Sequence, residues 1–202
     1  MYQIYFKRLF DILFSIILII FLSPVMILVF FFVWLNIGFP IFKQKRPGLN
    51  NKVFTLYKFK TLHDIKKNIP ENKRVNKIGN FLRITGLDEL PQLFNILFNK
   101  MSFVGPRPLL IKYLKINEFK NHNRKKIKPG ITGLAQIEIF NTKKKIVNKW
   151  KKQFELDNYY YNNLTFYLDL KILFKTFLKL FRLSKQDYHS IKEIELSGKY
   201  IK

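Results

Sequence analysis

The sequence predicts an α+β protein that is mostly helical and that attaches to a membrane near its N-terminus. The first sign is a run without charged residues, residues 12–42, which is long enough to form a membrane helix. The second is a pair of short apolar runs separated by turn residues, which indicates a β-hairpin. The third is a basic amphipathic segment at residues 166–183, of the kind that lies in a membrane interface.

The composition restricts the possible functions. The chain has 202 residues, with 37 Lys and Arg against 13 Asp and Glu, which gives a formal charge of +24. This charge favours an anionic partner: nucleic acid, acidic lipid head groups or a phosphorylated substrate. Cysteine is absent, which excludes disulfides and thiolate metal sites, and His63, His122 and His189 have no ligand-like spacing. A hydrophobic content of 48% excludes a disordered basic tail.

Residues 1–42 are predicted to form a membrane helix with a kink. Pro24 follows Ser23 in the middle of the apolar run, and a proline removes one helical hydrogen bond and crowds the preceding turn. Basic residues flank the run on both sides, and such residues favour the cytoplasmic face; they are Lys7, Arg8, Lys43, Lys45 and Arg46. Two interpretations stay open, an ordinary kinked span or a re-entrant helix that bends at Ser23-Pro24 and returns. A secretory signal peptide would need a shorter apolar region and a small-residue cleavage site.

Residues 43–184 are predicted to form a second region, which begins with the hairpin. Its turn is RPGLNNK, and the period of two in the second strand places Phe54, Leu56, Lys58 and Lys60 on one face. Lysines are common on solvated edge strands, so Lys58 and Lys60 need no functional explanation on this ground alone. Residues 64–77 are polar and are predicted to form a loop.

Residues 77–97 are predicted to form a helix, a break at Gly86 and a second helix with Pro91 in its first turn. Asp88 and Glu89 would then lie at or near the start of the second helix. Position alone favours the simpler interpretation, in which two acids complement the helix dipole. The alternative is a nucleophilic or metal-binding carboxylate, which a helix N-terminus would keep ionised.

Two arginines make the second interpretation chemically specific. Arg83 lies about one turn before the acidic pair, and Arg107 lies between two prolines in VGPRPLL, which stiffen its loop. Arginine binds phosphate through a bidentate fork. A carboxylate among phosphate-binding cations suggests phosphoryl transfer through an acyl phosphate, with Mg²⁺ screening the approach of one anion to another.

The last part of the region is expected to be helical and to touch the membrane. KPGITGLAQ has the composition of a tight turn before a short strand, and residues 143–157 read as a basic helix. In the 166–183 segment, Lys171, Lys175 and Lys179 share one face and apolar residues fill the other. An interfacial helix is favoured over a soluble helix packed on a core, because the polar face is almost purely cationic. Residues 185–202 are expected to form an irregular tail.

The chain resembles the bacterial sugar transferases, the monotopic phosphoglycosyl transferases that start glycoconjugate assembly on a polyprenol phosphate. The resemblance runs from about Lys7 to Ser184 and includes the Ser23-Pro24 break. Its motifs, in order, are KRLFDI, FKQKRPGL, YKFKT, LDELPQLFNIL, MSFVGPRPLL, KPGITGLAQ and KKQFELD. So many motifs in one order are highly specific, and the length is similar to that of the minimal catalytic form.

The resemblance implies that a sugar-1-phosphate is transferred from a UDP-sugar to undecaprenyl phosphate, with release of UMP. It implies that Asp88 attacks the β-phosphate to form a covalent phosphosugar-enzyme and contacts Mg²⁺, while Glu89 orients groups or transfers a proton. Lys58, Arg83, Arg107 and Asp157 match the family's basic and polar site residues. The resemblance also favours the re-entrant interpretation at Ser23-Pro24. It implies the cytoplasmic face of a bacterial inner membrane, contact with anionic lipid and, as possible partners, downstream glycosyltransferases.

Three short stretches depart from the family pattern. Where the family often has Asn-Gly-Arg-Asn after LAQ, this chain has IEIFN at residues 137–141, which leaves the identity of the donor sugar open. Asn99-Lys100 replaces a usual Gly-Asp, and Gly86 stands where a Ser is common. None of these changes touches the acidic pair, so we expect activity to be retained.

Other functional classes fit less well. A basic membrane-anchored module that binds anionic lipid or nucleic acid would explain the charge, but not the ordered DELP and GPRP motifs, and no nucleic-acid motif is found. CDP-alcohol phosphotransferases would require several spans and a spaced aspartate motif. Polytopic transferases of the same overall reaction would require about ten spans. No nucleic-acid partner is therefore expected.

Overall fold

A computed structural model describes residues 2–63, 77–141 and 149–182 of the protein. Most of the described residues are helical, and the strands form two sheets of two strands each. The strands are β1 (Ile41–Pro47), β2 (Val53–Phe59), β3 (Ser102–Val104) and β4 (Gly130–Thr132). The helices are α1 (Lys7–Ile37), α2 (Lys77–Thr85), α3 (Gln92–Leu97), α4 (Asn117–Asn121), α5 (Leu134–Asn141), α6 (Lys149–Asn162) and α7 (Phe166–Arg182). The predicted tail, residues 185–202, and most of the predicted 64–77 loop lie outside the described residues.

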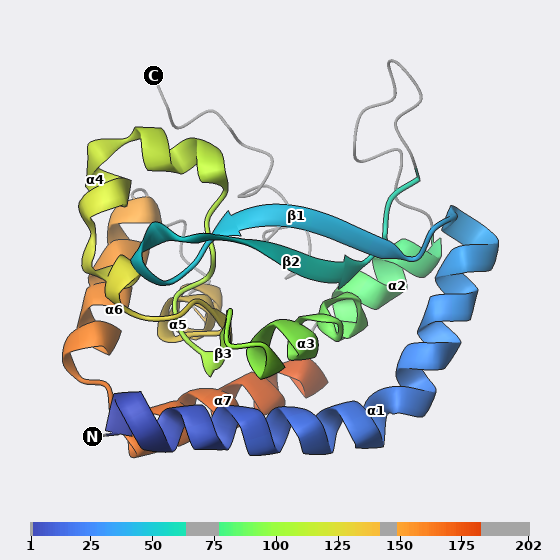
Figure 1. Ribbon diagram of the computed structural model, residues 1–202, viewed down its shortest axis with the longest axis horizontal. Helices are drawn as coiled ribbons and strands as arrows, with labels where there is room; N and C mark the ends of the chain where they lie inside the picture. Colours follow the sequence, from blue (N-terminus) through green and yellow to red (C-terminus); the bar gives the residue numbers. More distant parts are fainter. Residues whose placement is uncertain (1, 64–76, 142–148, 183–202) are drawn as a thin grey trace.

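Helix α1 is long, apolar and sharply bent (Figure 1). Its 31 residues make it the one helix in the described part of the chain that is long and apolar enough to cross a membrane. Pro24 lies inside it, and the hydroxyl of Ser23 donates to the carbonyl oxygen of Ile20 at 2.8 Å. The bend therefore has a local cause, because Pro24 has no N–H to donate to the preceding turn.

Both halves of α1 pack on the same globular body. We call the residues before Ser23 the first arm and those after Pro24 the second arm. The first arm contributes Phe10, Phe14, Leu18, Ile19 and Leu22 to the main hydrophobic cluster. The second arm contributes Val29, Val33 and Ile37 to another cluster, which includes Phe59 of β2. Because β2 also supplies Phe54 and Leu56 to the main cluster, one hairpin strand connects the two arms.

Polar contacts fix the position of the first arm against α3, β3 and α7. The Lys7 ammonium group donates to a carboxylate oxygen of Asp169 on α7, and Asp11 accepts from the Ser102 hydroxyl at 3.0 Å. Arg8 donates to the carbonyl oxygens of Ile96 and Leu97 at 2.7 and 2.8 Å, at the C-terminal end of α3. Cations stabilise helix C-termini, where carbonyl groups lack partners within the helix. Lys7 and Arg8, which the sequence suggested as flanking membrane charges, thus bind protein groups.

The predicted hairpin is confirmed. Strands β1 and β2 pair antiparallel, with Ile41 opposite Phe59 and Pro47 opposite Val53. The turn contains Asn50 and Asn51 with φ of 52° and 59°. Asparagine tolerates this left-handed conformation better than most residues, which explains the NN pair in the predicted turn.

A second sheet joins two motifs that are distant in the sequence. Strands β3 and β4 pair in parallel, with Ser102 opposite Gly130 and Val104 opposite Thr132. A Cβ on Gly105 would lie 2.3 Å from the carbonyl oxygen of Lys128, so only glycine allows this approach. The expected short strand therefore lies inside KPGIT, and the LAQ that follows it begins helix α5.

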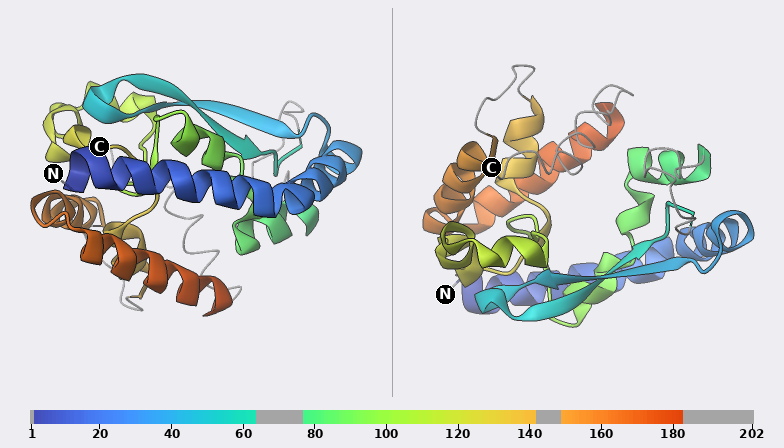
Figure 2. Two further views of the ribbon diagram at one scale, coloured as in Figure 1. Left: turned by 60° about the horizontal axis from the view of Figure 1, so that its bottom comes forward. Right: turned by 90° about the horizontal axis from the view of Figure 1, so that it is seen from above.

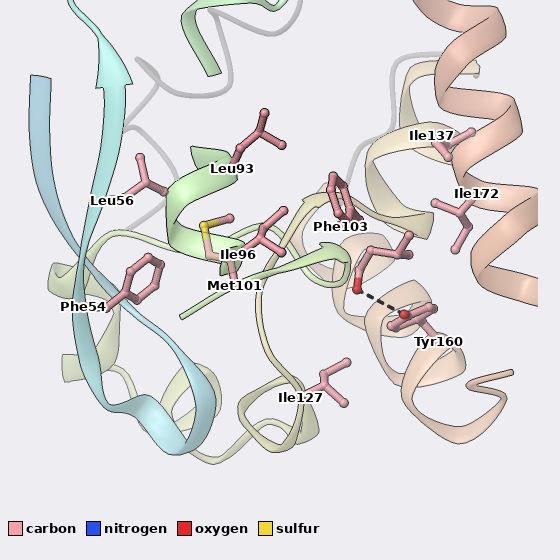
Figure 3. Packing of buried hydrophobic residues seen from close by; sticks show 11 residues of the cluster. Phe54, Leu56, Leu93, Ile96, Met101, Phe103, Ile127, Ile137, Tyr160 and Ile172 are labelled. Atoms are coloured by element: carbon pink, nitrogen blue, oxygen red, sulfur yellow. Dashed lines mark hydrogen bonds between the residues drawn. The ribbon is translucent and has the colours of Figure 1, made fainter. Parts of the chain in front are cut away.

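The main core lies between the hairpin, α3, the β3–β4 pair and the last three helices. Figure 3 shows Phe54 and Leu56 of β2 facing Ile96 and Met101, with Ile137 and Ile172 on the other side. The Tyr160 hydroxyl lies 3.2 Å from the carbonyl oxygen of Val104, a contact that Figure 3 marks with a dashed line. This core holds β3, and hence the GPRP loop that follows it, against α6.

Apolar side chains are exposed on the outer faces of α1 and α7. The first arm and α7 lie on the same side of the molecule, at the bottom of Figure 1 and at the front of the left view of Figure 2. On α7 the exposed apolar residues are Phe166, Tyr167, Leu170, Phe174, Phe177 and Leu178. Exposed apolar area of this extent indicates contact with a membrane or a partner rather than with water.

Candidate active site

The acidic pair lies in a short turn between two helices. Gly86 has a φ of 73°, a left-handed conformation that lets the chain leave α2. A 3-10 turn, Leu87–Glu89, follows, and α3 begins only at Gln92 after Pro91. The predicted helix, break and helix are therefore confirmed. The pair is not in the first turn of α3 but one turn before it.

Lys58 faces the acidic pair from strand β2. Its ammonium nitrogen lies 2.5 Å from Oε1 of Glu89 and 4.0 Å from Oδ2 of Asp88. The side chain thus bonds to Glu89 and only approaches Asp88. The alternation of the strand explains this position, because Phe54 and Leu56 enter the core from the same face. Lys58 lies farther along that face, beside the turn that carries the acidic pair.

Arg83 and Arg107 complete the positive surroundings of Asp88. The Nε of Arg83, on α2, donates to the Thr61 hydroxyl at 2.8 Å. Arg107 follows β3 in the loop that the second sheet holds. Both guanidinium groups lie near enough to lower the pKa of Asp88. The structure therefore brings Lys58, Arg83 and Arg107, which come from three separate segments, around one carboxylate.

Burial raises the pKa of Asp88 well above the usual value for an aspartate. Its pKa is raised to about 6 from an ordinary 3.8, and burial of the carboxylate is the main cause. Lys58 opposes the increase, the neighbouring Glu89 carboxylate adds to it, and the two arginines oppose it. The carboxylate is therefore mostly ionised at neutral pH. Its ionisation depends on the surrounding cations, whereas the sequence suggested the helix dipole as the cause.

Asp157 has a different neighbour from the other predicted site residues. It is buried on α6, and its Oδ2 lies 3.5 Å from a terminal nitrogen of Arg124. Arg124 in turn donates from its other terminal nitrogen to the carbonyl oxygen of Arg107. Burial raises the pKa of Asp157 to about 6, and Arg124 opposes this increase. Asp157 thus meets the site through Arg124 and the backbone of the GPRP loop.

The residues that the sequence did not point to are those that hold the site in place. Arg124, in the 3-10 turn Asn123–Lys126, gives no signal in a chain rich in basic residues. Thr61 ends the YKFKT motif, where a small polar residue is not distinctive. Asp169, which holds the first arm of α1 through Lys7, has the clearest signal in the sequence, since it is the single acidic residue of α7.

The carboxylates of Asp88 and Glu89 suit a hard cation that is also bound by substrate oxygen atoms. No group of three metal-ligating side chains occurs in the ranges that the structure describes. Mg²⁺ in phosphoryl-transfer enzymes is commonly held by one or two carboxylates together with substrate phosphates and water. Asp88, with Glu89 beside it, offers such carboxylates, so the residues present fit the ion.

Comparison with known proteins places the chain in a family. The sequence profile of the bacterial sugar transferases matches residues 2–183. The uncharacterized sugar transferase EpsL of Bacillus subtilis is 46% identical over 179 residues, which cover 86% of each chain. The UDP-glucose:undecaprenyl-phosphate glucose-1-phosphate transferase of Klebsiella pneumoniae is 40% identical over 87% of this chain and 40% of its own length.

A third relative, the undecaprenyl-phosphate galactose phosphotransferase of Salmonella typhimurium, is 35% identical over 84% of this chain and 39% of its own length. The chain thus spans about two fifths of these two longer relatives. The profile match covers nearly all of the sequence, including both arms of α1, the acidic pair and α7. The chain therefore belongs to the bacterial sugar transferase family.

Proposed function

We propose that the protein transfers a sugar-1-phosphate from a UDP-sugar to undecaprenyl phosphate and releases UMP. The observation that carries this proposal is a buried carboxylate, Asp88, that faces three cations from separate segments. The names of the two longer relatives support the acceptor and the reaction class. The reaction would be the first membrane step in assembling a bacterial glycoconjugate, and downstream glycosyltransferases would use its product.

The first step forms a covalent enzyme intermediate. An Asp88 carboxylate oxygen attacks the β-phosphorus of the UDP-sugar and forms a phosphorus–oxygen bond. The bond between that phosphorus and the bridging oxygen breaks, and UMP leaves with the bonding electron pair. Lys58, Arg83 and Arg107 would hold the diphosphate and neutralise the charge that develops on the leaving oxygen.

Glu89 and Mg²⁺ assist the attack in different ways. Glu89 binds Lys58 at 2.5 Å, which holds the ammonium group in place beside Asp88. Asp88 and the donor diphosphate would hold Mg²⁺, which would supply positive charge that screens the two anions as they approach. In this arrangement Glu89 orients its neighbours, and no proton has to move in the first step.

The second step transfers the phosphosugar to the lipid. A phosphate oxygen of undecaprenyl phosphate attacks the phosphorus of the aspartyl phosphosugar, and the bond to Asp88 breaks. The products are the free carboxylate and a polyprenyl diphosphate sugar. Oxygen, phosphorus and charge balance across the two steps without another reactant.

We also propose that α1 re-enters the cytoplasmic leaflet of the inner membrane and does not cross it. Both arms pack on one globular body, through the main cluster and the cluster around Phe59. A straight span would separate its ends by a hydrocarbon layer about 30 Å thick, which would pull one arm away from that body. The kink at Ser23-Pro24 supplies the turn. The active site would then face the cytoplasm, at the depth of the lipid phosphates.

The proposed reaction is tested by UMP release from a panel of UDP-sugars with undecaprenyl phosphate and Mg²⁺. Intact-mass measurement without acceptor should show a phosphosugar adduct on the wild type and none on Asp88→Asn. Glu155→Gln is a matched control, because Glu155 is an exposed acid on α6. An adduct on Asp88→Asn, or full turnover by it, would reject the nucleophile assignment.

The membrane arrangement is tested separately with cysteine labelling, since the chain contains no cysteine. Single cysteines at Tyr5 and Lys43 should both react with an impermeant reagent from the cytoplasmic side only. Labelling of these two positions from opposite sides would mean that α1 crosses the bilayer.

A further inference from the structure

We propose that a cavity between α5, α6 and α7 binds the phosphate head group and part of an acyl chain of one anionic phospholipid. The proposal rests on the membrane contact of α7 described above. It adds a lipid site that is separate from the residues around Asp88 and that takes no part in the transfer steps. Its occupant would be a structural lipid and not a substrate.

The cavity has the size and lining of a ligand site. Its volume is about 420 Å³, within the range of roughly 300–1,000 Å³ that is common for small-molecule pockets. Each of the three helices contributes an apolar wall residue, namely Leu134, Leu156 and Leu168. These side chains suit a hydrocarbon segment better than a sugar or a nucleotide.

The charged groups of the cavity favour an anion. Lys152, Lys171 and Lys175 line it, whereas Glu138 is its one acidic lining residue. Glu138 is already paired with Lys175 at 2.7 Å, and the nearest acid to Lys152 is the exposed Glu155 at 3.5 Å. The lining therefore keeps a net positive charge on two helices that face each other, which complements one phosphate group.

The position of the lysines on α7 connects the cavity to the membrane. Lys171 lies four residues after the exposed Tyr167 and three before the exposed Phe174, so it borders the apolar outer face. It also lines the cavity, together with Lys175 one turn later. Lysines at such borders place their ammonium groups at the level of lipid phosphates while their stems stay in apolar surroundings. A phosphate bound there would leave its acyl chain beside the apolar walls.

A phospholipid explains these features better than the acceptor lipid does. The acceptor phosphate has to reach the phosphosugar on Asp88, and the lining of this cavity contains none of Asp88, Lys58, Arg83 or Arg107. An anionic phospholipid needs only the head-group cations and an apolar slot. The bound lipid would hold α5 and α7 together at the point where Lys175 of α7 pairs with Glu138 of α5 at 2.7 Å.

The test is native mass spectrometry of the full chain in non-ionic detergent, titrated with phosphatidylglycerol or phosphatidylcholine. We expect one tightly retained phosphatidylglycerol and markedly weaker retention of phosphatidylcholine. Lys152→Gln/Lys171→Gln should weaken phosphatidylglycerol binding about thirtyfold, given the usual contribution of a lysine near a lipid phosphate. Lys112→Gln/Lys115→Gln is the matched control, with the same charge change in a 3-10 turn outside the cavity, and should bind as the wild type does.

Cavity-filling variants separate a true pocket from surface attraction. Leu156→Trp keeps every charge and should reduce retention at least tenfold, and Ile139→Trp is a second variant if the first folds poorly. Unchanged retention in a folded filling variant would overturn the proposal. So would equal binding by the two phospholipids, or displacement of phosphatidylglycerol by equimolar undecaprenyl phosphate. Asp88→Asn should retain the lipid normally, so failure of the transfer reaction is distinguishable from failure of this site.

Discussion

Two buried carboxylates of this protein, Asp88 and Asp169, each face a lysine, and they differ in how fully they are bonded. Asp169 accepts from Lys7, from the Tyr2 hydroxyl at 2.7 Å and from the Tyr160 hydroxyl at 2.6 Å. For Asp88, the nearest cation among the described residues is Lys58 at 4.0 Å, which is beyond hydrogen-bonding distance. One carboxylate is satisfied, and the other keeps oxygen atoms available for a substrate.

This difference distinguishes Asp169, a carboxylate with a structural role, from Asp88, a carboxylate that is proposed to react. Buried charges usually persist only when their hydrogen bonds are complete. Asp169 meets that requirement and connects the first arm of α1 with α6 and α7. In the described part of the chain, the cation closest to Asp88 stays at 4.0 Å, and burial raises the pKa of Asp88 to about 6. A buried carboxylate whose pKa is raised destabilises the fold when it is ionised, and such a cost is typical of residues that act on a ligand.

The largest expected effect comes from removing the charge of Asp88. Asp88→Asn should lower turnover by at least about a thousandfold, because the amide cannot form the acyl phosphate. The same change should raise the free energy of unfolding at pH 7.5 by about 1–3 kcal/mol, since the folded state disfavours the ionised form. UMP release and thermal unfolding in detergent measure the two effects. If Asp88→Asn is inactive but also less stable than the wild type, Asp88 contributes to the fold as Asp169 does, and the proposed difference between the two carboxylates is wrong.

The structural pair should respond in the opposite direction. Asp169→Asn takes the hydrogen-bonded carboxylate away from the buried Lys7 ammonium group, leaves Asp11 as its nearby charge, and should lower the free energy of unfolding by about 3 kcal/mol. The double variant Lys7→Met/Asp169→Asn should recover much of that loss, because it removes both charges. Chemical denaturation in detergent provides the measurement. If the single variant is as stable as the wild type, the pair has no structural role.

The pH dependence tests the ionisation of Asp88. A carboxylate nucleophile attacks only when it is ionised, and the pKa of Asp88 is raised to about 6, so kcat/KM should fall about tenfold per pH unit below pH 6. The same group destabilises the fold fully above pH 6, and this effect disappears as the pH falls below its unfolded value near 4. Asp157 titrates in the same range, so Asp157→Asn is the control. The inflection should stay near pH 6 in that variant, and its loss would assign the titration to Asp157.

The smallest expected effect comes from changing Arg124, whose guanidinium group donates to the carbonyl oxygen of Arg107. Arg124→Lys keeps a positive partner for Asp157 but loses the fork that also reaches the Arg107 carbonyl oxygen. We expect KM for the UDP-sugar to rise roughly tenfold with kcat nearly unchanged, because only the positioning of the phosphate-binding loop is affected. Lys126→Gln, a nearby exposed cation, should leave both constants unchanged. A roughly tenfold fall in kcat with no change in KM would argue against a positioning role for Arg124.

Local patterns in the sequence predicted the elements that need few distant contacts. The NN turn and alternating strands indicated the hairpin, and Gly86 and Pro91 indicated the break between α2 and α3. The α7 segment was predicted within about one residue of its observed end, although its lysines face α5 and the cavity. A short strand beside the KPG turn was expected, but its parallel pairing with β3 was not predicted, because both strands are short and their pairing partners are about thirty residues apart.

The sequence alone was enough to single out the acidic pair and its adjacent motifs and to predict the apolar helix and its kink. Each of these features depends on neighbouring residues or on fixed spacings along the chain. Sequence position predicted Arg83 and Arg107 as cations near Asp88, and the family motifs added Lys58. Only the tertiary structure decided that Asp157 reaches the site through Arg124, and that Lys7 pairs with Asp169. These pairs join residues far apart in the chain, and a chain with 37 basic residues offers each acid many possible partners. Burial and packing select one of them, since a buried charge is stable only beside the group that compensates it.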